Sequence, residues 1–119
     1  MYVGRIVAVG RTRDGRNAAL YRVSSRSFPN RQAVDLGGRL AIVPSPGAED
    51  DVRKNQYIAY NAIRTVSGRA IPTNGPHTDP NTETVAAGID PRDAPALSLH
   101  MLDLSTKHIL RCRRYSVRK

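Results

Sequence analysis

The fold class is decided by residues 57–71, which read YIAYNAIRTVSGRAI. Ile, Tyr and Val favour a strand over residues 57–66, although the apolar spacing would also fit a helix. The pair Ser67-Gly68, followed by further strand-forming residues at 69–71, is typical of a hairpin turn. We therefore predict a strand over 57–66 that turns back into a second strand.

Three more strand patterns lie on the N-terminal side of this hairpin. They are residues 2–9 (YVGRIVAV), 18–24 (AALYRVS) and 39–43 (RLAIV). The first two are joined by a turn over residues 10–17, in which Asp14-Gly15 is a hairpin signal. Proline and glycine predict a loop over residues 44–51. The N-terminal part of the chain is therefore predicted to consist of strands.

Two helix-capping patterns lie on the C-terminal side. A polar loop over residues 73–79 leads to Asp79-Pro80, which can cap and start a helix that ends at Gly88. Asp90-Pro91 repeats the pattern and predicts a second helix, in which Pro95 removes one backbone hydrogen bond. The apolar side chains of this second helix are those of Ala94, Leu97, Leu99, Met101 and Leu102.

Strands that precede helices predict an α+β fold, with helices covering one face of a largely antiparallel sheet. After residue 104 the pattern of strands and helices is lost. Nothing that follows is predicted to cover the other face of the sheet.

The positive charge is concentrated at one end of the chain. The 119 residues carry a formal net charge of +9, and residues 105–119 alone contribute +6 without a single acid. Residues 1–104 carry only +3, from 13 basic and 10 acidic side chains. We interpret the basic segment as solvated. The alternative is a small nucleic-acid-binding protein whose basic tail contacts phosphate backbones without specificity.

Several classes of protein and site are excluded by what the sequence lacks. No apolar run approaches the roughly 18–20 residues of a membrane span, and the N-terminus lacks the apolar stretch of a signal peptide, so we expect a cytoplasmic protein. Cys112 is the only cysteine, which excludes an intramolecular disulfide. The histidines His77, His100 and His108 have no metal-ligand spacing, and no nucleotide-binding glycine loop occurs. We expect neither a metal nor a cofactor.

Residues 24–31 (SSRSFPNR) form the most informative loop. Pro29 favours an extended, irregular backbone here. Three serines and two arginines within eight residues can offer hydroxyls, guanidinium forks and backbone amides to one anion such as a phosphate. The alternative is an exposed polar loop without a ligand.

Longer motifs resemble a known family. Residues 1–11 (MYVGRIVAVGR) and 21–31 (YRVSSRSFPNR) are similar to the archaeal-type IMP cyclohydrolases. Tyr57-Ile58-Ala59-Tyr60-Asn61 with Ile63-Arg64, then Asn74-Gly75 with His77-Thr78-Asp79, and finally Arg92-Asp93-Ala94 with Leu97-Ser98-Leu99 match further along in the same order. The resemblance covers residues 1 to about 103.

The resemblance implies an enzyme of purine biosynthesis, a hydrolase acting on cyclic amidines. The family closes the ring of 5-formamidoimidazole-4-carboxamide ribonucleotide, giving inosine monophosphate (IMP) and water without a cofactor. The implied fold is a four-layer αββα sandwich like that of the N-terminal-nucleophile hydrolases. The chain begins Met1-Tyr2 and supplies no N-terminal nucleophile, which agrees with chemistry that needs no covalent intermediate.

The reaction suggests roles for the matching residues. We expect Arg31 to donate to the formyl or carboxamide oxygen and Tyr60 to donate a proton or orient the substrate. Asn61 and Asn74 would read the edge of the base. The predicted catalytic residues are Arg31, Tyr60 and Asn61. The predicted nucleotide-binding residues, the first four of which would cradle the 5′-phosphate, are Ser24, Ser25, Arg26, Ser27, Asn30, Asn74, His77 and Asp79.

The resemblance ends near Asp103. We expect residues 1–103 to form an incomplete IMP cyclohydrolase-like domain, and residues 104–119 to be a basic, non-matching tail, with a reading-frame shift as our hypothesis for its origin. Half of a four-layer sandwich would leave an apolar sheet face and unpaired edges in water and could be inactive. The remaining alternative is a non-catalytic subunit or fragment that a partner chain completes. A homo-oligomer is compatible with the sequence.

Overall fold

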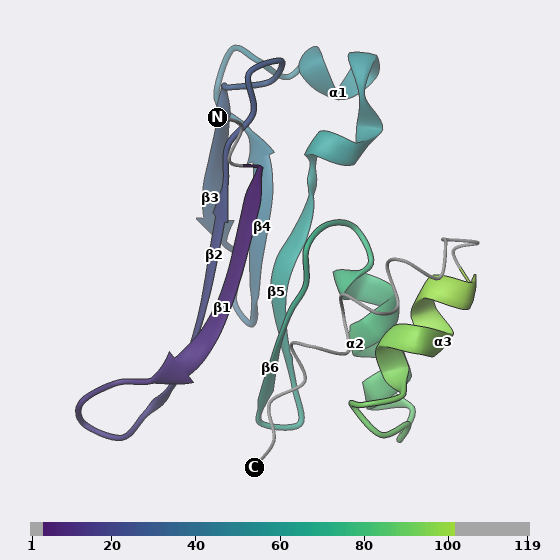
Figure 1. The fold of residues 1–119 in the computed structure, drawn as a ribbon. Helices are drawn as coiled ribbons and strands as arrows, with labels where there is room; N and C mark the ends of the chain where they lie inside the picture. Colours follow the sequence, from purple (N-terminus) through teal and green to yellow (C-terminus); the bar gives the residue numbers. More distant parts are fainter. Residues whose placement is uncertain (1–3, 102–119) are drawn as a thin grey trace.

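The computed structural model describes residues 4–101 of the chain, which form two sheets and a small group of helices (Figure 1). The strands of this described part are β1 (Arg5–Arg11), β2 (Asn17–Val23), β3 (Arg31–Asp35), β4 (Arg39–Pro44), β5 (Tyr60–Val66) and β6 (Arg69–Pro72). Its helices are α1 (Asp51–Lys54), the 3₁₀ helix η1 (Gln56–Ile58), α2 (Thr78–Ala86) and α3 (Ala94–Met101). The predicted α+β class is confirmed.

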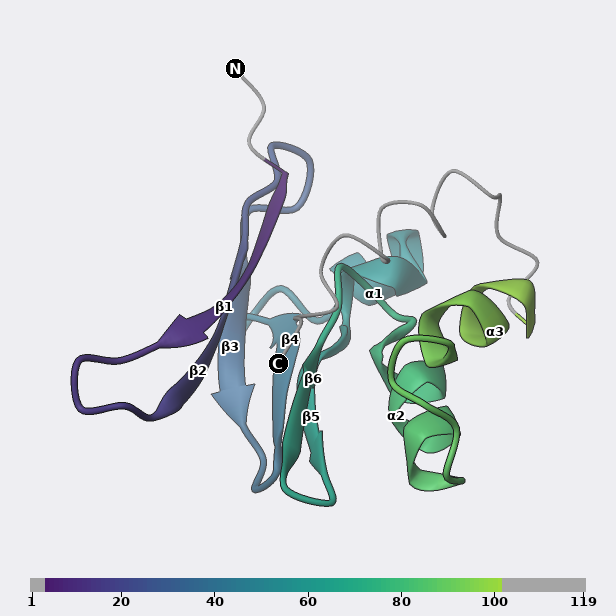
Figure 2. The ribbon, with the colours of Figure 1, turned by 60° about the horizontal axis from the view of Figure 1, so that its bottom comes forward.

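All strand pairs in this region are antiparallel, but they form two sheets instead of the one predicted. β1 and β2 make a two-stranded hairpin in which Arg5 pairs with Val23 and Arg11 with Asn17. The second sheet has the order β3-β4-β5-β6. The polar loop that follows β2 separates the two sheets, because it carries the chain away from the hairpin before β3 pairs with β4 (Figure 2).

A β-bulge in β5 determines which side chains reach each face of the second sheet. Leu40 pairs with Ile63 and Ala41 with Asn61, so Ala62 is an extra residue in β5. A bulge interrupts the strict alternation of side chains along a strand. Ala62 and Ile63 therefore both belong to the apolar cluster, whereas Asn61 and Arg64 both bond to α2.

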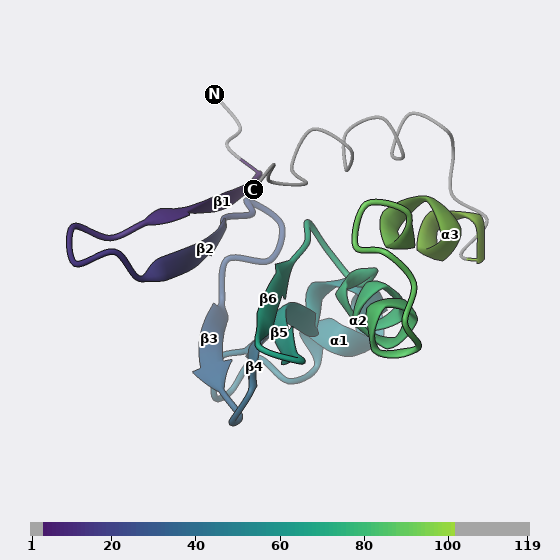
Figure 3. The same ribbon diagram turned by 90° about the horizontal axis from the view of Figure 1, so that it is seen from below.

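The hairpin and α2 pack against the second sheet from different sides. Val23 and Tyr21 of β2 contact the buried side chains of Ile42, Tyr60 and Ala62, which form the sheet's apolar cluster. α2 packs along β5 and touches α3, whose hydroxyl Ser98 Oγ lies 3.5 Å from Thr84 Oγ1. Figure 3 shows β5 and β6 between the hairpin and these helices.

The structure corrects the predicted bounds of two helices. α2 begins at Thr78, so Asp79 lies inside the first turn instead of capping it. Pro80 also lies in the first turn, where the backbone amides have no partner within the helix, so the proline costs no helical hydrogen bond. Asp90 does not cap a helix either: its side chain accepts from the backbone N–H of Arg92 at 2.8 Å, and α3 starts at Ala94. Pro95 therefore lies in a first turn and removes no helical hydrogen bond.

Two further corrections concern residues near the strands. Tyr57 and Ile58 belong to η1 and not to the strand predicted over 57–66, because the Asn55 side chain accepts from the Tyr57 N–H at 2.9 Å and starts a helical turn. Residues 31–35, for which we predicted no strand, form β3. The predicted tail over residues 104–119 and the helix residue Leu102 lie outside the described residues.

Candidate active site

Two tyrosines from different sheets form the centre of the candidate site. The hydroxyl oxygens of Tyr21 in β2 and Tyr60 in β5 lie 2.7 Å apart, within hydrogen-bond distance. Their rings meet edge to face, with centroids 6.2 Å apart and an angle of 82° between the planes. Tyr60 is only 8% exposed, so this hydrogen bond forms at the edge of the apolar cluster.

Arg5 lies against the same pair from the first strand. Its guanidinium carbon is 5.0 Å from the centroid of the Tyr60 ring, a distance at which a cation is attracted to the aromatic face. The loop before α2 touches Arg5 from another direction. A Cβ placed on Gly75 would lie 3.0 Å from Arg5 Nη1 and 3.8 Å from Nδ1 of the buried His77.

Arg31 approaches from the start of β3. Its Nε donates to the backbone carbonyl of Phe28 at 3.1 Å, and the hydroxyl of Ser25 accepts from the Phe28 N–H at 3.1 Å. Ser25 and Arg31 therefore hold the 25–31 loop in a compact turn. The positive charge of the Arg31 guanidinium acts on the ionisation of Tyr21.

The pKa of Tyr21 is raised well above its ordinary value. Burial is the main cause, and the hydrogen bond with Tyr60 adds to it, while the positive charges of Arg5 and Arg31 oppose the shift. A hydrogen bond raises the pKa of a phenol that donates it, because ionisation removes the bonding proton. Tyr21 therefore keeps its proton at neutral and moderately alkaline pH.

The remaining residues of the predicted phosphate loop are more open. Ser24, Arg26, Ser27 and Asn30 are exposed, and so is Asn74 in the loop before α2. The backbone N–H of Ser24 donates to Gly4 at 2.9 Å and the carbonyl of Asn30 accepts from Ser45 at 2.9 Å, so both ends of the loop are tied to neighbouring strands. The side chains of Ser24, Arg26, Ser27 and Asn30 are therefore open to solvent along this loop.

Asn61 and Asp79 form a separate polar network on the α2 side of β5. The Asn61 side-chain amide donates to both carboxylate oxygens of Asp79, at 2.8 and 3.1 Å. Arg64 Nη1 donates to Asp79 at 3.1 Å and to Glu83 at 2.7 Å. The bond to Glu83 is the main reason why the pKa of Arg64 is raised. This network ties α2 to the sheet.

The structure thus brings three predicted segments together. Arg31, Tyr60 and the Gly75–His77 loop converge on Tyr21 and Arg5, whereas Asn61 and Asp79 bond to one another. Our sequence analysis did not single out Tyr21 and Arg5. The strand period could have found Tyr21: it faces inward with Val23, and a buried tyrosine hydroxyl requires a partner.

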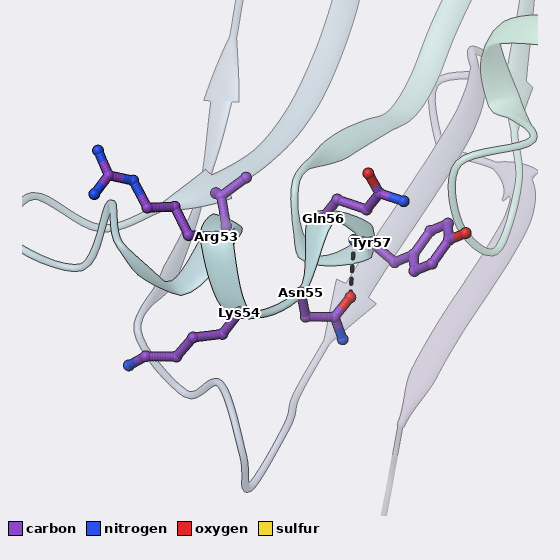
Figure 4. A pocket seen from close by; sticks show the side chains of 6 residues that line it. Arg53, Lys54, Asn55, Gln56 and Tyr57 are labelled. Carbon is purple, nitrogen blue, oxygen red and sulfur yellow. Dashed lines mark hydrogen bonds between the residues drawn. The ribbon is translucent and has the colours of Figure 1, made fainter.

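A hollow of about 640 Å³ lies apart from this cluster, along α1 and η1 (Figure 4). Its lining is the run of residues from Val52 to Tyr57, and none of the predicted site residues belongs to it. In Figure 4 the side chains of Arg53 and Lys54 point away from each other. They pair with Asp50 and Asp51, at 3.4 and 3.1 Å. The hollow therefore offers no converging set of ligand-binding groups.

The part of the chain that the structure describes holds neither a candidate metal site nor a helix that could span a membrane. Between residues 4 and 101, no three His, Cys, Asp or Glu side chains are grouped so that they could hold a metal ion. None of the helices described here is long and apolar enough to cross a membrane.

The cluster offers complementary chemistry to a polar ligand. Guanidinium groups only donate hydrogen bonds and stay charged, so Arg5 and Arg31 suit phosphate, carbonyl or developing oxyanion groups. A phenol both donates and accepts, so Tyr60 can pass a proton to a ligand or orient one. The two cations can therefore bind an oxygen-rich anion, and the phenol beside them can protonate a leaving group.

Comparison with known proteins assigns the chain to a protein family. A model of the family described as IMP cyclohydrolase-like protein matches residues 2–108. IMP cyclohydrolases of Methanosphaera stadtmanae and Methanocella arvoryzae are 48% and 52% identical over 103 and 104 residues, covering 87% of this chain and 50% of each relative. The Halobacterium salinarum IMP cyclohydrolase is 46% identical with the same coverage. The chain spans about half the length of the curated relatives it matches, and it belongs to the IMP cyclohydrolase-like protein family.

Proposed function

We propose that this chain takes part in the IMP cyclohydrolase reaction, in which 5-formamidoimidazole-4-carboxamide ribonucleotide closes to IMP with loss of water. The observation that carries the proposal is the convergence of Arg31 and Tyr60 with the Gly75–His77 loop around one pair of phenols. Membership of the family supports it, since relatives that share 46–52% of the aligned residues are named IMP cyclohydrolase.

The reaction joins two groups of one substrate. The carboxamide nitrogen adds to the formyl carbon and loses one proton, while the formyl oxygen takes up the electron pair of the broken π bond and a proton. The hydroxyl of this carbinolamine then takes a second proton and leaves as water, while the formamide nitrogen forms the C=N bond and loses its proton. Holding both groups in a reactive conformation supplies much of the rate, because no second molecule has to be brought in.

In this proposal Arg31 and Tyr60 serve the two oxygen-centred steps. Arg31 donates to the formyl oxygen as negative charge develops on it. Tyr60 gives a proton to the departing oxygen. Neither step needs a metal or an organic cofactor, so we propose that the chain uses none.

The proposed nucleotide-binding groups lie on the 24–31 loop and on the loop before α2. The exposed side chains of Ser24, Arg26 and Ser27, with Asn30 at the end of the loop, would bind the 5′-phosphate, while Ser25 holds the loop in shape. Asn74 and His77 lie on the loop that touches Arg5, a position suited to the base. For Asn61 or Asp79 to contact the nucleotide, the hydrogen bonds between them would have to open.

We propose the four-layer αββα sandwich of the N-terminal-nucleophile hydrolases as the complete fold. A helical layer beside a sheet, with a further pair of strands on the other side, supports this assignment. Residues 1–103 would then be the part of the domain that carries the candidate site, with 104–119 as a separate basic segment.

The test is a rate measurement on the 119-residue chain with the formamido ribonucleotide, following IMP by chromatography. IMP formation above the uncatalysed rate, lost when Arg31 is replaced by Ala, supports the proposal. The proposal is wrong if IMP forms no faster than without protein and calorimetry shows no binding of IMP.

A further inference from the structure

Arg5 belongs to the candidate site, but the proposed reaction gives it no task. Its guanidinium carbon lies 5.0 Å from the centroid of the Tyr60 ring, so the aromatic face attracts and supports the cation. The backbone of Gly75 also approaches so closely that a Cβ there would lie 3.0 Å from Arg5 Nη1. The tyrosine ring and the glycine therefore hold this guanidinium in one place.

The ion pairs of the described residues leave Arg5 without a carboxylate partner. Arg5 takes part in none of the ion pairs found among residues 4–101, whose basic members are Arg16, Arg53, Lys54 and Arg64. A guanidinium has five N–H donors and no acceptor, so it suits an oxygen that carries negative charge. Arg5 is also an exposed residue, so a ligand in solution can reach it.

The location of Arg5 connects it to both loops that we propose to bind the nucleotide. Arg5 pairs with Val23 at the end of β2, and the backbone N–H of Ser24 donates to the carbonyl of Gly4 at 2.9 Å. Arg5 therefore lies where the 24–31 loop leaves the hairpin. Gly75, which the guanidinium touches, belongs to the loop before α2.

The charge of the chain is concentrated around the same region. Residues 5–31 hold seven arginines and one acid, whereas residues 32–101 hold six basic and eight acidic side chains. A local excess of one charge attracts ligands of the opposite charge. The hairpin and the 24–31 loop therefore attract an anionic nucleotide more strongly than the rest of the described chain does.

We infer that Arg5 is a further nucleotide-binding residue, whose guanidinium is held by the Tyr60 ring and the Gly75 backbone and donates to an oxygen of the bound ligand. The inference rests on the proposed function, which supplies the ligand. The nucleotide has two kinds of oxygen that suit a guanidinium, those of the 5′-phosphate and the carbonyl oxygen of the base. Arg5 adjoins the loop proposed for the phosphate and touches the loop proposed for the base, so both oxygens share the chemistry that it recognises.

Binding measurements with three ligands test this inference and identify the oxygen. The ligands are IMP, inosine, which lacks the phosphate, and purine riboside 5′-monophosphate, which lacks the base carbonyl. We expect Arg5→Gln to weaken IMP binding at least about tenfold in calorimetry, because a charged donor is replaced by a neutral one. If Arg5 donates to the phosphate, the substitution leaves inosine binding unchanged. If Arg5 donates to the base carbonyl, it leaves the binding of purine riboside 5′-monophosphate unchanged.

The matched control is Arg22→Gln. Arg22 is an exposed arginine of the same hairpin, and it pairs with Ile6, so strand alternation places it on the opposite face from Arg5. Its replacement should change the dissociation constant for IMP by less than about twofold, because solvent and salt screen an exposed charge that does not touch the ligand. Arg5→Lys keeps the charge but not the planar fork, so it should recover only part of the affinity that Arg5→Gln loses.

A measurement on the unchanged chain does not depend on the folding of a variant. In ¹⁵N spectra of the arginine side chains, the Nε–H signal of Arg5, identified by its absence from Arg5→Lys, should shift when IMP is added, while that of Arg22 stays in place. The inference is overturned if the Arg5 signal does not move while IMP binds, or if a folded Arg5→Gln binds IMP as tightly as the unchanged chain.

The same measurements separate the failure of this inference from that of the proposed function. A chain that binds IMP through Arg5 but forms none from the formamido ribonucleotide contradicts the proposed reaction alone. A chain that forms IMP equally fast and binds it equally tightly without Arg5 contradicts this inference alone. A chain that binds none of the three ligands overturns the inference together with the proposed site.

Discussion

Arg31 combines a structural and a proposed chemical task in one side chain. Its Nε holds the Phe28 carbonyl, and its remaining N–H groups can face the nucleotide. We predict that Arg31→Ala lowers kcat/KM for IMP formation at least about tenfold, because a fixed charged donor to the developing oxyanion is lost. Arg31→Lys should recover only part of the rate, since lysine keeps the charge but not the planar fork. An unchanged rate in Arg31→Ala would remove this residue from the mechanism.

Gly75 is needed where the loop before α2 touches Arg5. Its φ of +127° is a conformation that other residues rarely adopt, and an added Cβ would meet Arg5 Nη1 at 3.0 Å. We predict that Gly75→Ala lowers the free energy of unfolding by about 1–3 kcal/mol, measured by urea denaturation. Gly47→Ala is the matched control, because Gly47 also has a positive φ (+87°) but no neighbour within 4 Å of an added Cβ. Equal losses in both variants would contradict a specific contact with Arg5.

Tyr21 should make stability sensitive to alkaline pH. Its pKa is higher in the folded chain than the ordinary 10.0, so the folded state binds this proton more tightly than the unfolded state does. That contribution is fully present below pH 10.0 and is lost as the pH rises above it. The free energy of unfolding of the unchanged chain should therefore fall more between about pH 8 and about pH 11 than that of Tyr21→Phe. Parallel pH dependences in urea titrations would refute this.

Among the secondary-structure elements, α3 depends on one buried face. Leu99 is 0% exposed, whereas Leu97 on the same helix is 42% exposed. We predict that Leu99→Ala lowers the free energy of unfolding by about 2–5 kcal/mol, because it leaves a cavity. Leu97→Ala removes the same atoms from a half-solvated position and should cost less than about 1 kcal/mol. If denaturation shows similar losses, α3 is not packed through Leu99.

Sequence patterns predicted the two hairpins from their turn signals, whereas neither Asp79 nor Asp90 caps a helix as predicted. The Asp14-Gly15 and Ser67-Gly68 turns lie between paired strands, as expected. β3 was missed because residues 31–35 lack a run of apolar side chains, and its pairing with β4 is a tertiary effect. The bulge at Ala62 was equally invisible, because it depends on the register between β4 and β5.

The sequence predicted only some of the residues of the candidate site. Arg31, Tyr60 and His77 were singled out from motifs, and the fold brings their segments together. Arg5 and Tyr21 also lie in matching stretches, but their strand pattern assigns them no role, and only the packing of the hairpin onto the second sheet shows their contact with Tyr60. Composition could not have indicated the Tyr21–Tyr60 contact, since these residues are 39 positions apart.

Across the whole molecule, the candidate site lies where the two sheets meet. β1 and β2 contribute Arg5 and Tyr21, while the second sheet and the loop before α2 contribute the other groups. The other face of the hairpin carries the exposed apolar side chains of Ile6 and Leu20. Correct docking of the hairpin on the second sheet is therefore the condition for bringing these groups together.

The central claim is that these segments form one nucleotide site, and an amide NMR titration of the chain with IMP tests it most directly. We predict that the backbone signals of Arg31, Tyr60 and Gly75 shift together and yield one dissociation constant, while signals along the hollow at 52–57 stay in place. Shifts confined to residues outside this cluster, or different dissociation constants for its members, would contradict the claim.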